Sequence, residues 1–400
     1  MAERSGIDRR GMTTLSAGHL AADYASGSVP ALIPFLTDKF DLSYALAALL
    51  LLAATISSSL VQPLFGLWSD RRGALWLIPG GVLLAAVGVA GAAVSPAYPL
   101  TLLLVLCGGI GVAAFHPEGA KYALYASGRK RASGMSYFNI GGNTGYALGA
   151  FVTGQLVVWL GLRGAAVAMV AVLAASVVLA RESPRLRLLA DGDAGRTNAH
   201  GTDDRRAMAL LGSVIALRSV SWFTLLAFVP LWATAHGHSK AAGNRLLFLM
   251  LIAGAVGTLV LGALADRIGL RRTLVLTQAA IPPAILLFVY AGGIPGAVGL
   301  MLVGVCTVGS FGVTMVLSQL YLPRHVGMAS GLSVGLAMGI GGVAAVVLGA
   351  VADAIDLKTA LTACAIAPAL GVVVSFRLPA PARRTTPPAE LRAQTASSPT

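Results

Sequence analysis

The chain has 400 residues, a length that ordinarily predicts two or three soluble domains. Its composition excludes a soluble protein: 56% of the residues are hydrophobic, 11% are charged and the mean hydropathy is +0.79, whereas a soluble domain has about 25% charged residues. A disordered chain is excluded for the same reason. The three cysteines all fall inside apolar runs, so no disulfide framework is predicted.

Apolar runs long enough to cross a bilayer as a helix recur along the whole chain. Twelve such spans use about 240 residues at about 20 each, which leaves about 160 of the 400 for connections and tails. The sequence therefore predicts an all-α membrane protein with twelve transmembrane helices. They are expected at roughly 13–37, 44–68, 74–94, 98–126, 132–159, 163–181, 207–235, 244–265, 272–292, 295–321, 325–353 and 357–376.

Two polar segments divide this pattern. Residues 182–206 are the one long polar interior stretch and are predicted to be a flexible linker, and residues 379–400 are predicted to be a disordered tail. The expected domains are thus a first six-helix bundle over 1–181 and a second over 207–378. Linker and tail are both expected in the cytoplasm.

The basic residues predict the orientation. The two termini and the even-numbered connections hold 23 of the 29 Lys and Arg residues, counting Lys121 at the inner end of the fourth span. The odd-numbered connections hold 5, and Arg218 lies within the seventh span. Because positive residues favour the cytoplasmic side, both termini are predicted inside, in the inner membrane of the cell. The net charge of +13 then reflects topology and lipid headgroups, and no nucleic-acid partner is expected.

The chain also repeats itself. The segment 66–73, GLWSDRRG, follows the second span, and 262–269, GALADRIG, follows the eighth, at an offset of 196 residues. The segment 132–136, ASGMS, opens the fifth span, and 329–333, ASGLS, opens the eleventh, at an offset of 197. Two six-helix bundles related by a pseudo-twofold axis are typical of transporters that rock one half against the other.

These repeated loops resemble the major facilitator superfamily, and within it the fosmidomycin-resistance type of drug exporter. The stretches that carry the resemblance are HxxxD at 19–23, Gln62-Pro63, FHPE at 115–118, GGN at 141–143 and GMxSG at 327–331. The resemblance implies the major facilitator fold and proton-driven export of small drug-like molecules, hence antibiotic resistance. An importer of a small organic anion by proton symport is the alternative, because the same fold and charges serve either direction.

Ionisable groups at membrane depth are costly and therefore functional candidates. Only two of the sixteen carboxylates, Asp23 and Glu118, lie well inside spans. His19 and Asp23 are four residues apart on one helix face, where a carboxylate and an imidazole can exchange a proton. The alternative is a structural pair that fixes the first helix against a neighbour.

His116 and Glu118 flank Pro117 in the fourth span, where the proline removes a backbone donor. We expect Glu118 and His116, with Asp23 and His19, to couple transport to protons. The alternative for Glu118 is a structural ion pair with Lys121.

Arg218 lies about eleven residues into the seventh span, or about 16 Å from its start. It follows Asp23 by 195 residues, close to the repeat offset, so the two residues should sit at similar depth in opposite halves. An arginine there suits an anionic substrate group. The alternatives are a direct Asp23–Arg218 salt bridge that latches the halves, and helix packing.

Further polar groups fall into two sets. Asn139, Asn143 and Gln319 are expected either to contact substrate or to bond a neighbouring helix. Asp70, Arg71, Asp266 and Arg267 lie in the repeated loops and are expected to act in gating. Glycines recur every four residues at 141, 145 and 149 and at 327, 331, 335 and 339, a spacing that lets helices pack closely and slide.

No nucleotide-binding loop, metal motif or catalytic set is present in the sequence. We therefore expect no metal, no cofactor and no enzyme activity, with an ion gradient as the energy source. The expected partners are a small-molecule substrate, protons and the lipid bilayer, and a monomer is expected.

Overall fold

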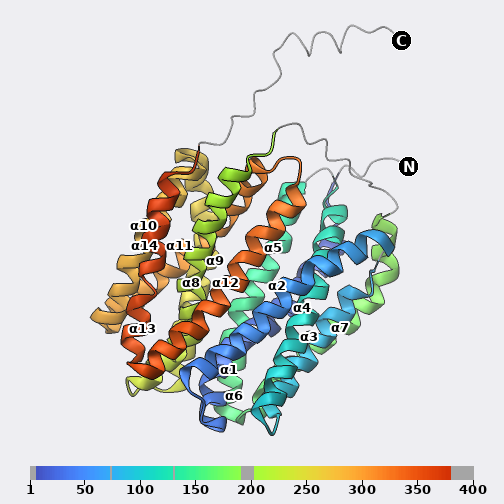
Figure 1. Ribbon diagram of the computed structural model, residues 1–400. Helices are drawn as coiled ribbons and strands as arrows, with labels where there is room; N and C mark the ends of the chain where they lie inside the picture. The colour runs from blue at the N-terminus through green and yellow to red at the C-terminus, as the bar shows by residue number, and fades with distance from the viewer. Residues whose placement is uncertain (1–5, 73, 129–130, 191–201, 380–400) are drawn as a thin grey trace, which may run out of the picture.

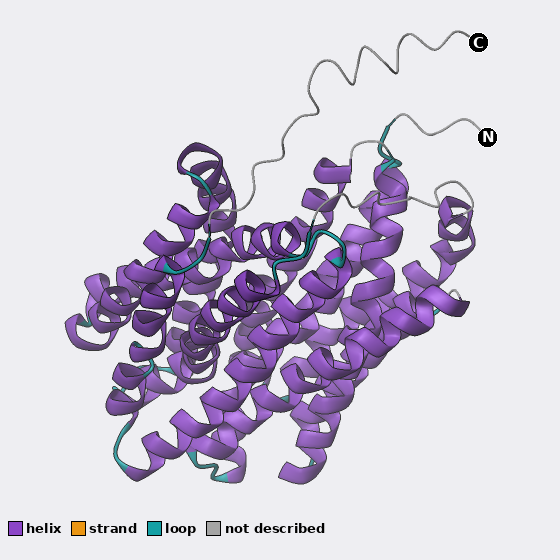
Figure 2. Ribbon diagram, turned by 45° about the horizontal axis from the view of Figure 1, so that its top comes forward, coloured by secondary structure: helices purple, strands orange, loops and turns teal. Residues whose placement is uncertain are grey.

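The computed structural model describes residues 6–72, 74–128, 131–190 and 202–379, and over these residues it contains helices and loops without a strand (Figures 1 and 2). The first half contains α1 to α7 with one π-helical turn, and the second contains α8 to α14. The helices of the first half are α1 (Arg9–Phe40), α2 (Tyr44–Arg72), α3 (Leu77–Val94), α4 (Tyr98–Ser127), α5 (Arg131–Leu148), the π-helix η1 (Gly149–Thr153), α6 (Gly154–Leu160) and α7 (Arg163–Ala190). Those of the second half are α8 (Arg205–Ala235), α9 (Lys240–Ile268), α10 (Leu270–Ala291), α11 (Gly293–Tyr321), α12 (Val326–Ala354), α13 (Leu357–Ala363) and α14 (Ile366–Phe376).

Two of the expected spans are each divided into shorter helices. The span predicted at 132–159 runs through α5, η1 and α6, and the span predicted at 357–376 breaks between α13 and α14. Pro368 explains the second break, because proline has no N–H for the carbonyl of Cys364, four residues earlier. Ser221 of α8 donates its hydroxyl to that carbonyl at 2.6 Å instead.

Counting each divided span once, the described residues form twelve helical rods, which fits the predicted fold class. Nine helices in the described ranges are long and apolar enough to cross a membrane by length and composition. The helix α1 is more polar than these nine, because Asp23 lies within it and charged residues mark both its ends. The polar residues in α1 mark the site described below.

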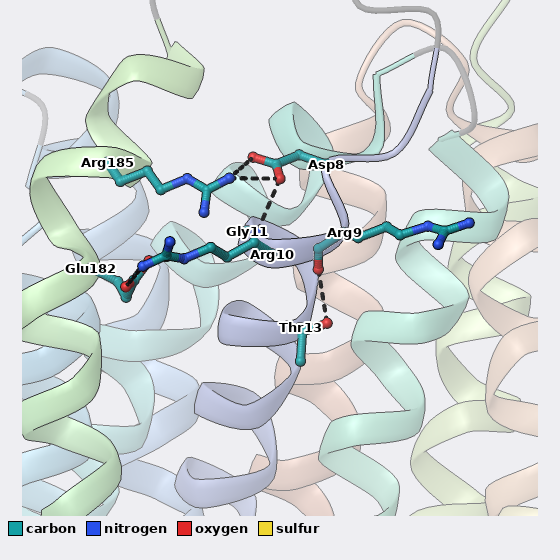
Figure 3. Close-up of polar contacts among 7 residues, drawn as sticks. All are labelled: Asp8, Arg9, Arg10, Gly11, Thr13, Glu182 and Arg185. Carbon is teal, nitrogen blue, oxygen red and sulfur yellow. Dashed lines mark hydrogen bonds and ion pairs between the residues drawn. The ribbon is translucent and has the colours of Figure 1, made fainter.

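The helix α7 continues nine residues past its predicted end at 181. Residues 182–190, expected in the linker, are therefore helical. Figure 3 shows how they are held: Arg10 pairs with Glu182 at 2.5 Å, and Arg185 with Asp8 at 3.1 Å. Asp8 also caps α1 by accepting from the Gly11 N–H. Residues 191–201 of the expected linker and 380–400 of the expected tail lie outside the described residues.

The two termini lie at one end of the bundle, here called the terminal end, and the connection from α1 to α2 lies at the other, the distal end (Figure 1). A buried apolar cluster within the first half runs from Met12 to Leu189. A second cluster joins Ile33, Ala47 and Leu51 of the first half to Phe228 and Leu247 of the second. The interface between the halves is thus packed toward the distal end.

The first of the two predicted glycine stripes packs as expected. A Cβ on Gly141, Gly145 or Gly149 would collide with successive backbone carbonyls of α1, at Ser16, Leu20 and Tyr24. The stripe on α12 differs: among the described residues, a Cβ on Gly335 or Gly339 would meet nothing within 4 Å, so the close contacts expected for these glycines are not found there. The surroundings of Gly327 and Gly331 lie outside what the structure describes.

Polar contacts also close the distal end. Asp353 of α12 accepts from the N–H groups of Tyr44, at 2.7 Å, and Ala45, at 3.0 Å, which begin α2. Lys240 of α9 pairs with Asp38 of α1 and lies 4.9 Å from the centre of the Phe35 ring. Each contact joins one half to the other. Asp353 also satisfies N–H groups that have no partner within α2 and lies at the positive end of its dipole.

We expect Asp353→Ala to open the distal end. Loss of two charge-assisted hydrogen bonds at a helix N-terminus is worth about 1–2 kcal/mol, or about a 5–30-fold change in the ratio of closed to open molecules. Spin labels at residues 43 and 235, which line one distal cavity from opposite halves, would report a longer distance population. Asp356→Ala is the matched control, because Asp356 caps α13 within the second half by accepting from Thr359 N–H at 2.6 Å. Equal distance distributions for both variants would contradict the assignment of Asp353 as a latch.

Candidate functional site

The centre of the first half contains a cluster of two histidines around one carboxylate. Nε2 of His19 lies 3.3 Å from one oxygen of Asp23, and Nε2 of His116 lies 3.3 Å from the other. Asp23 is fourteen residues along α1, or about 21 Å from the terminal end. The sequence placed His19 and Asp23 on one face, but it gave no indication that α4 brings His116 to the same carboxylate.

Backbone carbonyls orient both imidazole rings. Nδ1 of His19 lies 2.8 Å from the Phe138 carbonyl on α5, and Nδ1 of His116 lies 2.9 Å from the Val112 carbonyl on α4. A carbonyl oxygen only accepts, so each Nδ1 carries hydrogen and each Nε2 faces the carboxylate. The His19 ring also stacks on Phe138, with centroids 4.1 Å apart.

Gly142 of α5 closes one side of this cluster. A Cβ there would lie 2.5 Å from Nε2 of His19 and 2.6 Å from Oδ2 of Asp23. The glycine therefore allows α5 to approach the cluster. The GGN motif marked this glycine in the sequence, but its contact partners come from α1.

The remaining proton candidate lies nearer the terminal end. Glu118 is fully buried, and one of its oxygens lies 3.4 Å from Nζ of Lys121. The ion pair considered as the alternative for Glu118 is therefore present in this structure. Glu118 lies two residues beyond His116 on α4 and pairs with Lys121, whereas Asp23 pairs with His19 and His116.

In the second half, Arg218 is buried at a similar depth. It lies thirteen residues along α8, or about 20 Å from the terminal end, and is 4% exposed. Its Nη1 donates to Oγ of Ser310 on α11 at 2.6 Å, and Ser310 in turn donates to the Cys306 carbonyl at 2.5 Å. Ser310 was not expected from the sequence, because a serine in an apolar span is usually bonded within its own helix.

The direct salt bridge between Asp23 and Arg218, considered as a latch, is not formed in this structure. Both residues are described, and each has other neighbours: the two histidines for Asp23, and Ser310 for Arg218. Since Arg218 has five N–H donors and its described partner is a neutral hydroxyl, its charge lacks the carboxylate that usually accompanies a buried arginine.

The other predicted residues make no hydrogen bond or ion pair with His19, Asp23, His116 or Arg218 among the described contacts. Asn139 is exposed and Asn143 is partly buried beside Gly142. Gln319 is nine residues beyond Ser310 on α11, or about 13 Å nearer the terminal end, and so is not at the depth of Arg218. Asp266 and Arg267 are exposed, whereas the side chains of Asp70 and Arg71 lie outside the described residues.

The donor types of the cluster also bear on metals. The ligand atoms of His19, Asp23 and His116 lie within 4.8 Å of one another, and two imidazoles with a carboxylate are groups that bind divalent transition metals as well as protons. The sequence predicted no metal, and it did not foresee that these groups meet. A test of the cluster therefore needs a chelator control.

Twelve helical rods in two halves, with ionisable groups buried in each, are typical of a multi-pass membrane transporter. The family model of the Major Facilitator Superfamily matches residues 15–239 and again 211–399. The chain belongs to the Major Facilitator Superfamily.

Individual relatives are consistent with this family. The chain is 32% identical over 372 residues to an uncharacterized MFS-type transporter, YfnC, of Bacillus subtilis, with 90% of each chain covered. It is 29% identical over 369 residues to the fosmidomycin resistance protein of Escherichia coli, covering 90% of this chain and 91% of that protein. The predicted resemblance to this type of protein is confirmed.

Solved structures show the same fold at low identity. A bacterial homologue of the human lysosomal transporter Spinster, in an inward-facing conformation, has a TM-score of 0.73 at 14% identity, covering 92% of this chain and 96% of that one. The inward-open xylose transporter XylE of Escherichia coli has a TM-score of 0.74 at 15% identity, covering 96% and 98%. At this identity the likeness establishes the fold alone.

The packing of Gly142 yields a prediction. Gly142→Ala should displace His19 or Asp23 and destabilise the folded protein by about 1–3 kcal/mol, as overpacking does. Gly312→Ala is the control, since a Cβ on Gly312 would meet nothing within 4 Å. The apparent melting temperatures of the two variants in detergent measure the difference. Equal melting temperatures for the Gly142→Ala and Gly312→Ala proteins would contradict the tight packing of Gly142 against His19 and Asp23.

Proposed function

We propose that this protein is a proton-coupled exporter of small anionic or amphiphilic drug-like molecules that works by alternating access. The observation that carries the proposal is the pairing of two buried centres at matching depth: a histidine–aspartate–histidine cluster in the first half and Arg218 in the second. The likeness to a fosmidomycin resistance protein supports export. The substrate, the direction and the proton coupling are the proposed parts.

The number of protons that His19, Asp23 and His116 can share supports the coupling role. With both Nδ1 atoms occupied by hydrogen, each contact from Nε2 to Asp23 is favourable only when a proton lies between the two atoms. The closed cluster therefore holds two shared protons and one net positive charge. Loss of one proton places a ring lone pair against a carboxylate oxygen, which repels, and so loosens the contact between α1 and α4.

The state of Arg218 supports an anionic substrate. A guanidinium keeps its charge at any working pH, and burying it without a carboxylate is costly. A phosphonate, phosphate or carboxylate of the substrate would supply the missing charge and accept two parallel hydrogen bonds. Arg218 is 4% exposed in this structure, so the helices around it must separate toward the cytoplasm before a substrate anion can bind.

The closed distal end supports an inward-facing assignment for this structure. Under the proposed topology the termini are cytoplasmic and the latch at Asp353 lies on the outer side of the inner membrane. In the export cycle, substrate binds near Arg218 from the cytoplasm as the cluster releases a proton. The halves then rock, substrate leaves outside, and protons reload Asp23 and its histidines.

The coupling role predicts that Asp23→Asn and His116→Gln abolish proton movement driven by substrate while leaving folded protein in the membrane. Neither replacement can exchange a proton in the working pH range, because the amide side chains of asparagine and glutamine do not titrate there. A pH-sensitive dye in proteoliposomes, read with and without a chelator on adding fosmidomycin, measures the signal and separates protons from metal. Substrate-driven proton movement at the wild-type rate in both variants would refute the coupling role.

Glu118 is tested in the same assay. Glu118→Gln should impair coupled transport if Glu118 carries a proton. If its role is only to pair with Lys121, the double variant Glu118→Gln with Lys121→Gln should recover the activity that the single variant loses. The direction of proton movement distinguishes the two modes of transport. Protons that move opposite to the substrate indicate export by antiport, and protons that move with it indicate import by symport.

The substrate role predicts that Arg218→Lys binds fosmidomycin about tenfold more weakly, because it keeps the charge but loses the two-pronged hydrogen bond. Arg218→Ala should lose anionic substrates and retain neutral ones. Arg272→Lys, at an exposed position of α10, is the matched control. Affinities measured by scintillation proximity or calorimetry decide the outcome.

The latch alternative makes the opposite prediction for a double variant. If Arg218 serves only to bind Asp23 in another state, Asp23→Ala with Arg218→Ala should recover the binding that each single variant loses, since no unpaired buried charge remains. We expect no recovery, because the two residues have separate partners in this structure.

A further inference from the structure

A groove on the flank of the bundle, near the distal end, joins the two halves. It has a volume of about 330 Å³ and is lined from the first half by Phe151, Val152, Gln155, Leu156 and Trp159, and from the second half by Arg245. Phe151 and Val152 lie on the π-helix η1, whose wide turn interrupts the span between α5 and α6. Across the interface, the Phe151 ring lies 4.8 Å from that of Phe248 on α9.

The groove combines an apolar wall with a polar end. Arg245 is exposed and lies five residues from the start of α9, about 7 Å along the helix, and no ion pair to it is found among the described residues. Trp159 is 73% exposed and lies next to the last residue of α6. Arginine and tryptophan at the end of a span occupy the level of the lipid headgroups.

A third polar group faces this groove. Nε2 of Gln155 is shielded from solvent and has no hydrogen-bond partner among the described residues. A turn of the Gln155 side chain toward the groove would let this amide donate to a phosphate or ester oxygen bound there.

We propose that the groove binds a phospholipid of the distal leaflet, with an anionic headgroup at Arg245 and an acyl chain along Phe151, Val152 and Leu156. Charge complementarity selects this occupant: the wall is apolar, the single charge is positive, and the position matches the headgroup level. Because the two sides of the groove belong to different halves, the bound lipid bridges them and stabilises the state with a closed distal end. The proposal does not depend on proton coupling or on the direction of transport.

The test measures lipid binding rather than transport. Native mass spectrometry of the full chain in detergent would compare phosphatidylglycerol with phosphatidylcholine of the same acyl chains. We expect phosphatidylglycerol to bind more tightly, and Arg245→Gln to weaken its binding about tenfold, the loss of one charge-assisted contact. Arg163→Gln is the matched control, because Arg163 is exposed at the start of α7 at the same end of the bundle.

A second variant separates the groove from its charge. Val152→Trp fills the apolar wall while leaving Arg245 in place, and it should reduce the binding of both lipids. Equal losses in Arg245→Gln and Arg163→Gln would show nonspecific attraction and overturn the proposal, as would unchanged binding in Val152→Trp. Weaker binding of fosmidomycin by Arg245→Gln, with phosphatidylglycerol binding intact, would assign the groove to substrate and also overturn it.

Discussion

The structure depends on how a bundle with few charges accommodates ionisable groups far from water. A buried charge is costly unless an opposite charge or a set of hydrogen bonds compensates it. Asp23 is compensated by two imidazoles, whose outer nitrogens are in turn fixed by backbone carbonyls. Arg218 has Ser310 as its described partner. The carboxylate of Asp23 is thus compensated, whereas the charge of Arg218 is compensated only in part. In the proposed function, the first half therefore carries protons and the second half binds the substrate anion.

The internal repeat gives this division a structural origin. Asp23 and Arg218 are 195 residues apart, one fewer than the offset between the repeated loops, and so lie at similar depth. The position 196 residues after His116 is Gly312. In each half, a charged residue on the first helix contacts a polar residue on the fourth. Asp23 of α1 contacts His116 of α4, and Arg218 of α8 contacts Ser310 of α11. The two halves differ in which side chains form this contact. A pseudo-symmetric fold can therefore place two different ligands at one depth without two different architectures.

The contact between the halves is uneven along the membrane normal. Three features join the halves at the distal end: apolar packing, the hydrogen bonds from the start of α2 to Asp353 of α12, and the pair between Lys240 and Asp38. Nearer the terminal end, a Cβ on Gly335 or Gly339 of α12 would meet nothing within 4 Å among the described residues. Glycines without a close partner in one state leave room for helix contact in another, which fits a rocking motion. The proposed lipid groove lies on the packed side, where a bridging molecule would favour the closed distal end.

The sequence by itself determined the class, the two halves and most of the helices, because length, hydropathy and repeated loops are local or periodic signals. It also identified Asp23, His116 and Arg218, since ionisable residues in apolar spans stand out by type. It did not determine that His116 meets Asp23, that Ser310 meets Arg218, or that Asp353 caps α2, because each contact joins residues about 90 or more positions apart. The longer α7 and the break before α14 likewise follow from partners elsewhere in the chain, Arg10 and Ser221. Which polar groups compensate one another is decided by how the helices pack, and only the tertiary structure contains that information.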